Sequence, residues 1–154
     1  MKGKKLLAGI LSVAMILGTM AFPAFAEGSN WAERANTKWY ADDTASEYTL
    51  STAEELAGLA SLVNNGTSFA NKTIKLGNDI DLEGIEWTPI GKQEDEKVLS
   101  FQGTFDGNGN TVKNLLITGS NSDVGLFGFT TNGEIKNFTL ENAQVSGYLD
   151  VGAV

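Results

Sequence analysis

The sequence contains no cysteine and no histidine among its 154 residues. Without cysteine, no disulfide can stabilise the fold, so stability has to come from a packed core. Without histidine, the chain holds neither a Ser-His-Asp nor a Cys-His nucleophile system, and it has no histidine-ligated zinc site. These two absences remove several large classes of hydrolase and metalloenzyme.

Basic residues are also few. The chain has 11 Lys and Arg against 19 Asp and Glu, and Arg34 is its sole arginine. Proteins bind nucleic acid when lysine and arginine displace counterions from the phosphates. We therefore expect no nucleic-acid partner, and we interpret the acidity as a solvated surface that keeps the chain soluble.

The N-terminus has the three parts of a cleavable signal peptide. Three lysines among the first five residues precede an apolar run at residues 6–22, which ends at Pro23. This run is short and interrupted for a membrane span, which needs roughly 20 mostly apolar residues. Ala24 and Ala26 supply the small residues that signal peptidase recognises. We expect cleavage after Ala26, export to the cell surface or the extracellular space, and no membrane span in the mature chain.

The mature chain is predicted to be one domain behind a polar lead. Removal of the three signal-peptide lysines leaves eight basic and 19 acidic residues, a net charge of −11. Residues 27–47 are polar, with scattered aromatics and no sustained period, which predicts an irregular lead. Residues 48–154 then form the folded part.

A helix is predicted at residues 53–64. Ser51 and Thr52 are both N-cap types, and each has a glutamate three residues later, which gives two candidate capping boxes. The apolar residues that follow are spaced to form one face of a helix, namely Leu56, Leu59, Ala60 and Val63. The sequence Asn64-Asn65-Gly66 suits a helix C-terminus.

Short strands are predicted after the helix. Apolar residues alternate with polar ones at residues 74–82, with a kink at Gly77-Asn78. Residues 92–97 are a charged loop that we expect to protrude. From Phe101 onward, short apolar segments are broken by glycine and asparagine every few residues.

Two internal repeats occur in this last part. The segment Val112-Lys113-Asn114 returns later as Ile135-Lys136-Asn137, and Asp123-Val124-Gly125 returns as Asp150-Val151-Gly152. Strand repeats with a period of roughly 20–45 residues are typical of a solenoid whose successive turns stack on each other. The first repeat would align Lys113 and Lys136 in one column on the outer face.

Several motifs together resemble the opening of bacterial surface proteins with GLUG-type repeats. They are the helix start at residues 51–56, Trp87-Thr88-Pro89-Ile90-Gly91, residues 101–112 and Val124-Gly125-Leu126-Phe127-Gly128. The resemblance covers residues 48–154. It implies an all-β fold, a right-handed parallel β-helix of the pectate-lyase-like class, with an N-terminal capping α-helix.

Members of that family often continue with many Val-Gly-Gly-Leu-Val-Gly units, whereas this sequence ends at Val154 within what should be such a unit. We therefore expect a fragment, truncated at the C-terminus, whose last strand has an open edge. Self-association through that open end is a further expectation.

The acidic residues suggest metal sites only at first sight. Asp106-Gly107-Asn108-Gly109-Asn110 begins like a calcium loop, but Thr111 stands where an EF-hand needs glycine and Ile117 where it needs glutamate. A corner in which asparagine side chains bond the backbone is the preferred interpretation. Asp79 and Asp81 are predicted on an outward face, where solvation is favoured over weak cation binding.

No catalytic, cofactor-binding or metal-ligating residue stands out. A pectate-lyase-like enzyme would need a basic proton acceptor beside acidic calcium ligands, but Arg34 lies in the polar lead, and repeats align lysines without any catalytic selection. A glycosidase needs two carboxyls at a defined separation, and no pair is marked by the sequence. The tryptophans could stack on sugars, but sealing of the fold is favoured for Trp31, Trp39 and Trp87.

These observations favour a secreted or cell-surface module without catalytic activity, which serves as a stalk or binds a glycan or an extracellular protein. One alternative is a fragment of a polysaccharide-active enzyme, a lyase or hydrolase. Another is an accessory GLUG-type region of a larger surface protease. The chain has no His-Glu-x-x-His motif, so it is not itself such a protease.

Overall fold

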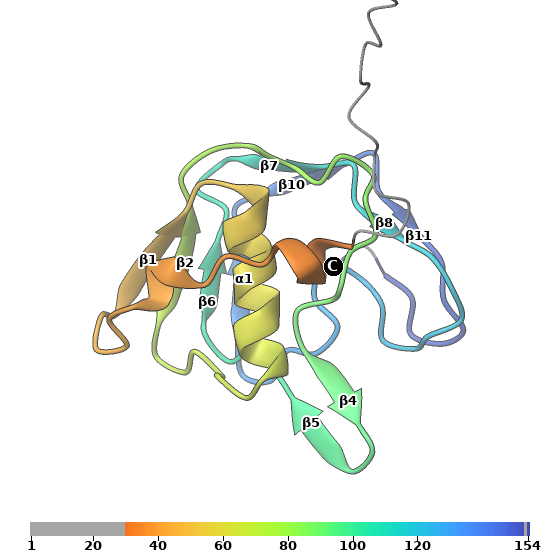
Figure 1. Cartoon of the computed structure of the whole chain (residues 1–154), viewed down its shortest axis with the longest axis horizontal. Helices are drawn as coiled ribbons and strands as arrows, with labels where there is room; N and C mark the ends of the chain where they lie inside the picture. Colours follow the sequence, from red (N-terminus) through yellow and green to blue (C-terminus); the bar gives the residue numbers. More distant parts are fainter. Residues whose placement is uncertain (1–29, 153) are drawn as a thin grey trace, which may run out of the picture.

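The computed structural model describes residues 30–152 and residue 154 (Figure 1). The predicted signal peptide, residues 1–26 with Ala24 and Ala26, lies outside the described residues. Two 3₁₀ helices, η1 (Trp31–Arg34) and η2 (Lys38–Tyr40), come first. The elements that follow are β1 (Glu47–Leu50), α1 (Ala53–Asn64), β2 (Thr73–Leu76), β3 (Ile80–Asp81), β4 (Lys92–Glu94), β5 (Lys97–Leu99), β6 (Thr104–Asp106), β7 (Thr111–Lys113), β8 (Leu116–Ile117), β9 (Glu134–Lys136), β10 (Thr139–Glu141) and β11 (Gln144–Val145).

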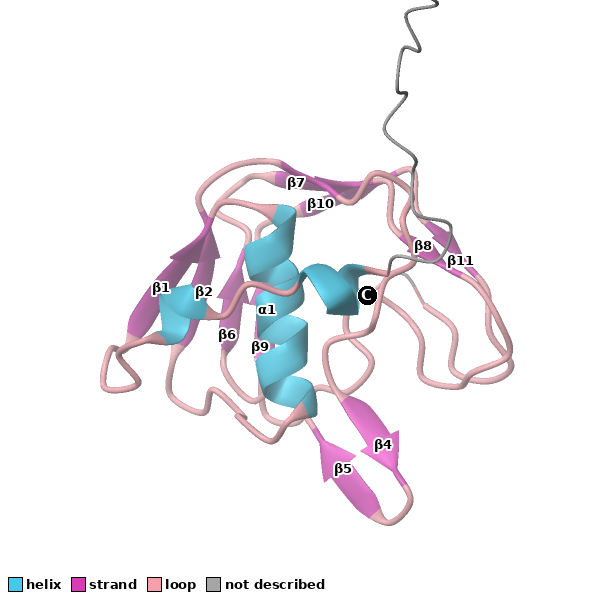
Figure 2. Ribbon diagram, viewed as in Figure 1, coloured by secondary structure: helices cyan, strands magenta, loops and turns pink. Residues whose placement is uncertain are grey.

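The strands form small sheets, and most of their pairings are parallel. One sheet has the order β1-β2-β6-β9, the second β10-β7-β3, and the third pairs β11 with β8, all in parallel. Strands β4 and β5 make an antiparallel hairpin that projects from the body at the bottom of Figure 2. The charged loop predicted at residues 92–97 therefore does protrude, as part of this hairpin.

The predicted all-β, right-handed parallel β-helix is wrong. The described residues form four small sheets of two to four strands, one of them antiparallel, together with a 12-residue α-helix that belongs to the core. The segments with period 2 are short, so they separate into small sheets. Helix α1 is amphipathic and buries one face in the core, with Leu56, Leu59, Ala60 and Val63 among the core residues. The fold is mixed, with mostly parallel strands and one central helix.

The prediction for α1 is confirmed at both ends. The Thr52 side chain caps the helix by accepting a hydrogen bond from the Glu55 N–H at 3.3 Å. In return, the Glu55 carboxylate accepts from the Ser51 N–H at 2.7 Å. The first contact satisfies a donor that a helix start leaves without a partner, and the second fixes the residue just before the cap, so the local sequence sets this boundary clearly.

Gly58, in the middle of α1, is required by packing. A Cβ at this position would fall on the backbone carbonyl oxygen of Asn36 and lie 3.1 Å from the Trp39 Nε1. The close approach lets the Asn36 N–H donate to the Glu54 carbonyl and the Trp39 indole donate to the Glu55 carbonyl. The segment before β1 is thereby attached to the helix.

Of the lead predicted at residues 27–47, the described residues 30–47 carry two short 3₁₀ helices and are attached to the core. Trp31 is only 2% exposed, and its indole N–H donates to the Leu82 carbonyl at 3.0 Å. Trp39 stacks on Phe69 with ring centroids 5.9 Å apart. Two isolated tryptophans attach this segment to the core. Because they do not form a regular apolar face, the sequence shows no periodic pattern here.

The core is built from apolar residues that align from strand to strand. Ile74 pairs with Phe105, which pairs with Ile135 in the four-stranded sheet. In the next sheet, Ile80 pairs with Val112. Residues 74–82 therefore alternate as predicted, but they belong to two sheets, with the bend at Gly77-Asn78 between them. Within the described ranges, no helix is long and apolar enough to cross a membrane.

Candidate functional site

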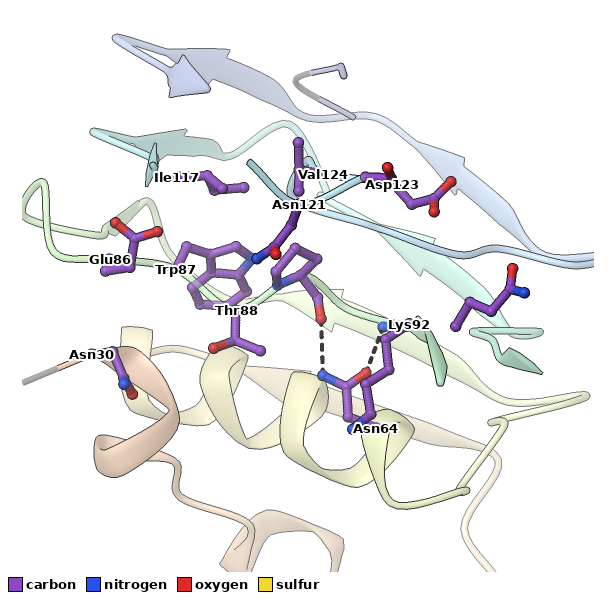
Figure 3. A pocket seen from close by; sticks show the side chains of 14 residues that line it. Asn30, Asn64, Glu86, Trp87, Thr88, Lys92, Ile117, Asn121, Asp123 and Val124 are labelled. Carbon is purple, nitrogen blue, oxygen red and sulfur yellow. Dashed lines mark hydrogen bonds between the residues drawn. The ribbon is translucent and has the colours of Figure 1, made fainter. Parts of the chain in front are cut away.

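A groove of about 500 Å³ lies between the segment before the β4–β5 hairpin and the loop after β8 (Figure 3). We call it the Asp123 groove. Most of its walls come from the segment between β3 and β4 with the start of β4, from the end of β8 with the loop that follows, and from the C-terminal turn of α1. The lining residues are Asn30, Asn64, Glu86, Trp87, Thr88, Pro89, Gly91, Lys92, Gln93, Ile117, Asn121, Ser122, Asp123 and Val124.

One wall is held in place by Asn64, the last residue of α1. Its side-chain amide donates to the Pro89 carbonyl at 3.0 Å, and its side-chain oxygen accepts from the Gly91 N–H at 3.0 Å (Figure 3). Both ends of the amide are thus used to fix the extended segment before the hairpin. The sequence marked Asn64 only as a helix-ending residue, because a contact between distant parts of the chain leaves no local signal.

Trp87 forms the buried part of the groove. It is 2% exposed, and its indole N–H donates to the Leu126 carbonyl at 3.2 Å. Trp31 is equally buried, and Trp39 is packed among Tyr40, Tyr48 and Phe69. Their placement agrees with the prediction that the tryptophans seal the fold. The groove therefore offers hydrogen-bonding groups rather than an open indole face.

Some polar groups of the groove already form hydrogen bonds within the chain, whereas others are exposed to solvent. Glu86 is held in place, because one carboxylate oxygen accepts from the Thr118 N–H at 2.8 Å and the other from the Thr118 hydroxyl at 2.9 Å. Asn121 and Ser122 are exposed, and Asp123 is half-buried. A ligand in the groove would meet the loop at residues 121–123, which carries an amide, a hydroxyl group and a carboxylate in sequence.

A smaller cavity of about 220 Å³ adjoins this groove on the α1 side. It shares Asn64, Trp87, Thr88 and Lys92 with the groove and is otherwise lined mainly by apolar and small residues of η1 and α1. The shared residues make the two cavities neighbours along one surface. The Asp123 groove, which carries several polar groups, thus continues into a smaller and more apolar cavity.

The calcium-loop candidate is a backbone corner. Asp106 accepts hydrogen bonds from the Asn108 N–H at 2.9 Å and from the Asn137 side chain at 3.1 Å. Asn110 donates to the carbonyls of Leu76 and Gly107. This is the corner that the sequence favoured. Among the described residues, no group of three or more Asp, Glu, His or Cys could hold a metal ion.

Asp79 and Asp81 lie on an exposed face, as predicted, but each carboxylate accepts hydrogen bonds from other residues of the chain. Asp79 accepts from the Thr111 N–H at 2.8 Å, and its other oxygen lies 3.9 Å from the Lys113 ammonium. Asp81 accepts from the Asn114 side chain at 2.8 Å. Arg34 lies 3.8 Å from Glu83 and over the Trp31 ring.

The predicted column of Lys113 and Lys136 is wrong. Lys113 aligns with Asp81 and Glu141, whereas Lys136 aligns with Asp106, which in turn aligns with Lys75. The two lysines belong to different sheets, and each sits in a column of alternating charge. A lyase-type cluster of lysines does not form at these positions.

Hydrogen bonds depress the pKa of two corner carboxyls. The Asn114 side chain lowers the pKa of Asp81 most, with help from the Glu83 N–H. The Asn108 N–H lowers the pKa of Asp106 most, followed by the Asn137 side chain. Hydrogen bonds favour the ionised form of a carboxyl, so both groups suit a structural acceptor rather than a catalytic acid.

Comparisons with known proteins give one likeness to report. The chain is 38% identical over 113 residues to halomucin of Haloquadratum walsbyi (strain DSM 16790 / HBSQ001), a match that covers 65% of this chain and 1% of halomucin. No family model matches the chain, and no solved structure matches it. The resemblance to GLUG-type proteins is tested by none of these comparisons and stays a prediction.

Proposed function

We propose that this chain is a secreted or cell-surface module that binds a neutral or amino-sugar glycan in the Asp123 groove without chemical turnover. The observation that carries the proposal is the groove itself, where exposed Asn121 and Ser122 and half-buried Asp123 stand beside a wall fixed by Asn64. Sugar hydroxyls are recognised by such planar amides, carboxylates and hydroxyls when the site is held rigid.

An extracellular or cell-surface location is supported by the likeness to halomucin, of which the chain spans about 1%. The predicted signal peptide agrees with export. The finer assignment, an adhesive or stalk-like role in a larger surface protein, rests on the repeats and on the resemblance to GLUG-type proteins.

The charge of the chain selects among glycans. With a net charge of −11 after signal cleavage and a carboxylate in the groove, the chain repels polyuronates and sulfated polysaccharides. A neutral or N-acetylated sugar meets no such repulsion, and a free amino group would pair with Asp123. A glycan of this class is favoured over a protein partner because the groove is a small concavity that presents hydrogen-bonding groups.

A non-catalytic role is supported by the state of the acidic groups. A retaining or inverting glycosidase needs one carboxyl as a proton donor and a second as nucleophile or base. In the groove, Glu86 is occupied through both oxygens by Thr118. The corner carboxyls Asp81 and Asp106 have lowered pKa values, which is the opposite of what a proton donor requires.

The test is isothermal titration of the secreted chain with chitotetraose, cellotetraose and tetragalacturonate. Saturable binding of one of the first two is expected, with at least a tenfold loss of affinity in the Asp123→Asn variant. Asp95→Asn is the matched control, because Asp95 also has a positive φ, 55° against 57°, and lies in the hairpin turn between β4 and β5. Equal binding by both variants, or preference for tetragalacturonate, would contradict the proposal.

A further inference from the structure

The smaller cavity that adjoins the Asp123 groove is built on one face of α1. We call it the alanine cavity. Ala57, Ala60, Ser61 and Asn64 are spaced along α1 so that they share one side of the helix. Asn64 lines both cavities, and Ala60 lies about 6 Å before it along the helix axis. A substituent on a sugar ring in the groove can therefore reach the alanine cavity.

The inner surface of the alanine cavity is apolar and fixed. Ala57 and Ala60 are 2% and 3% exposed, and the rings beside them are those of Trp31 and Trp87, each 2% exposed. Both indole N–H groups already donate to backbone carbonyls. The cavity therefore offers mainly carbon surface, and its walls are in place before a ligand binds.

Two hydroxyl groups and one ammonium group also line the alanine cavity. The side chains of Ser61 and Thr88 are half-buried and form no hydrogen bond within the described part of the chain. Lys92 carries a positive charge, 3.1 Å from the carboxylate of exposed Glu94. Among the described residues that line the cavity, none is acidic. These groups favour a neutral substituent that can donate and accept hydrogen bonds over a positively charged amino group.

The volume of the alanine cavity limits what can enter it. It measures about 220 Å³, whereas pockets for whole drug-sized ligands measure roughly 300–1,000 Å³. The cavity is therefore a subsite for part of a ligand. An acetamido group has the required chemistry, because it combines one methyl group with one amide N–H and one carbonyl.

We propose that the alanine cavity accepts the acetyl group of an N-acetylhexosamine whose ring lies in the Asp123 groove, an assignment that rests on the glycan binding proposed above. The methyl group packs on Ala57 and Ala60. The hydroxyls of Ser61 and Thr88 bond the amide. The cavity thereby makes the chain selective for N-acetylated glycans over plain glucans.

The expected selectivity follows from the apolar surface that the methyl group covers. A single carbon group in a fitted apolar pocket changes affinity by about tenfold or more. Chitotetraose, whose sugars are N-acetylated, should therefore bind about tenfold more tightly than cellotetraose, which has hydroxyl groups in the same positions.

The test is isothermal titration of the secreted chain and of two variants that narrow the cavity, Ala60→Leu and Ser61→Leu. Neither residue lines the Asp123 groove. Each variant should lower the affinity for chitotetraose by about tenfold, to the level of cellotetraose, and leave cellotetraose binding unchanged. Ala70→Leu is the matched control, because Ala70 is exposed and lines neither cavity.

A second measurement needs no variant and so does not depend on how well the variants fold. In the complex of the unaltered chain with chitotetraose, NMR should show nuclear Overhauser effects between an acetyl methyl group of the ligand and the methyl groups of Ala57 and Ala60. Thermal unfolding of each variant checks its fold, and Ser61→Leu is the safer change because Ser61 is only half-buried.

The outcomes separate this assignment from glycan binding in the groove. Equal affinity for the two tetrasaccharides, equal weakening of both in the variants, or an acetyl group without contact to Ala57 and Ala60 would overturn the acetyl site and leave groove binding intact. Binding of neither tetrasaccharide would overturn the proposed function, and the acetyl site with it.

Discussion

The Asn137 side-chain amide donates to the Asp106 carboxylate at 3.1 Å, across 31 residues of chain. The same carboxylate oxygen accepts the Asn108 N–H, so it closes the turn that follows β6 and also joins that turn to the next layer. Asn108 and Asn137 both have positive φ, 53° and 58°, a conformation that asparagine tolerates better than most residues.

The second sheet repeats this arrangement. Asp81 accepts from the Glu83 N–H at 2.8 Å and from the Asn114 side chain at 2.8 Å. The Lys-Asn pairs of the first internal repeat therefore occupy equivalent corners in two different sheets. In each pair, the asparagine side chain donates to an aspartate on the neighbouring strand of the preceding layer. This contact holds adjacent layers in register.

Replacing Asn137 by glycine tests this corner. Glycine accepts the positive φ, so the change removes the amide without adding backbone strain. We expect the pKa of Asp106 to rise towards its ordinary value of 3.8 and the melting temperature to fall. An NMR titration of the Asp106 carboxyl measures the first effect. An unchanged pKa in Asn137→Gly would show that the amide does not hold the carboxylate.

Acid should weaken the fold through the same carboxyls. Asp81 and Asp106 have folded pKa values below the ordinary 3.8, so the unfolded chain binds their protons first. The stability that they contribute is complete above that value and is lost as the pH falls through the lower folded pKa. We expect the melting temperature to drop below about pH 4, with a smaller drop in the D81N/D106N variant. Equal slopes for both proteins would refute this account.

The core should be most sensitive at Phe105. This ring is completely buried and contacts Phe127 and Phe138 at centroid distances of 5.2 and 5.6 Å. Phe105→Ala leaves a cavity and should lower the free energy of unfolding by about 3–5 kcal/mol, measured by urea denaturation. Val98→Ala is the control, since Val98 is 48% exposed on the hairpin and should change stability by less than about 0.5 kcal/mol.

Gly58→Ala distinguishes helix propensity from packing. Propensity alone predicts a gain of about 1 kcal/mol for alanine inside a helix. The new Cβ would instead collide with the Asn36 carbonyl and displace the segment before β1, for which we expect a net loss of about 1–3 kcal/mol. Ser61→Ala on the same helix should be close to neutral. A stabilised Gly58→Ala variant would show that the attachment to Asn36 is unimportant.

Local signals were enough to predict α1, because its caps and its apolar face all lie within one short stretch, positions 51–66 of the sequence. The prediction of strands at positions 74–82 also held, since alternation is a local pattern. The stacking of layers is not local. The Lys-Asn repeat suggested that Lys113 aligns with Lys136, but Lys113 pairs with Asp81 and Glu141. The Asp-Val-Gly repeat, in contrast, matches the observed pairing of Val124 with Val151.

The groove could not have been predicted from the sequence. Asn64 reaches Pro89 and Gly91 through contacts that join the end of α1 to the segment before the hairpin, and Asp123 comes beside them only when the loop after β8 has folded back. Pro89, Gly91 and Asp123 belong to motifs that carry the resemblance or the repeat, but no local pattern indicates that they meet Asn64. A sealing role for Trp31 was predicted, but its hydrogen bond to the Leu82 carbonyl, 51 residues away in the sequence, was not.

The most direct test of the account is an ¹H–¹⁵N NMR titration of the secreted chain with chitotetraose. The proposal predicts saturable shifts that cluster at Asn121, Ser122 and Asp123 and at Gln93, which lines the same groove, while the amides of β1 stay unchanged. Shifts confined to other surfaces, or no shifts with either chitotetraose or cellotetraose, would contradict glycan binding in the Asp123 groove.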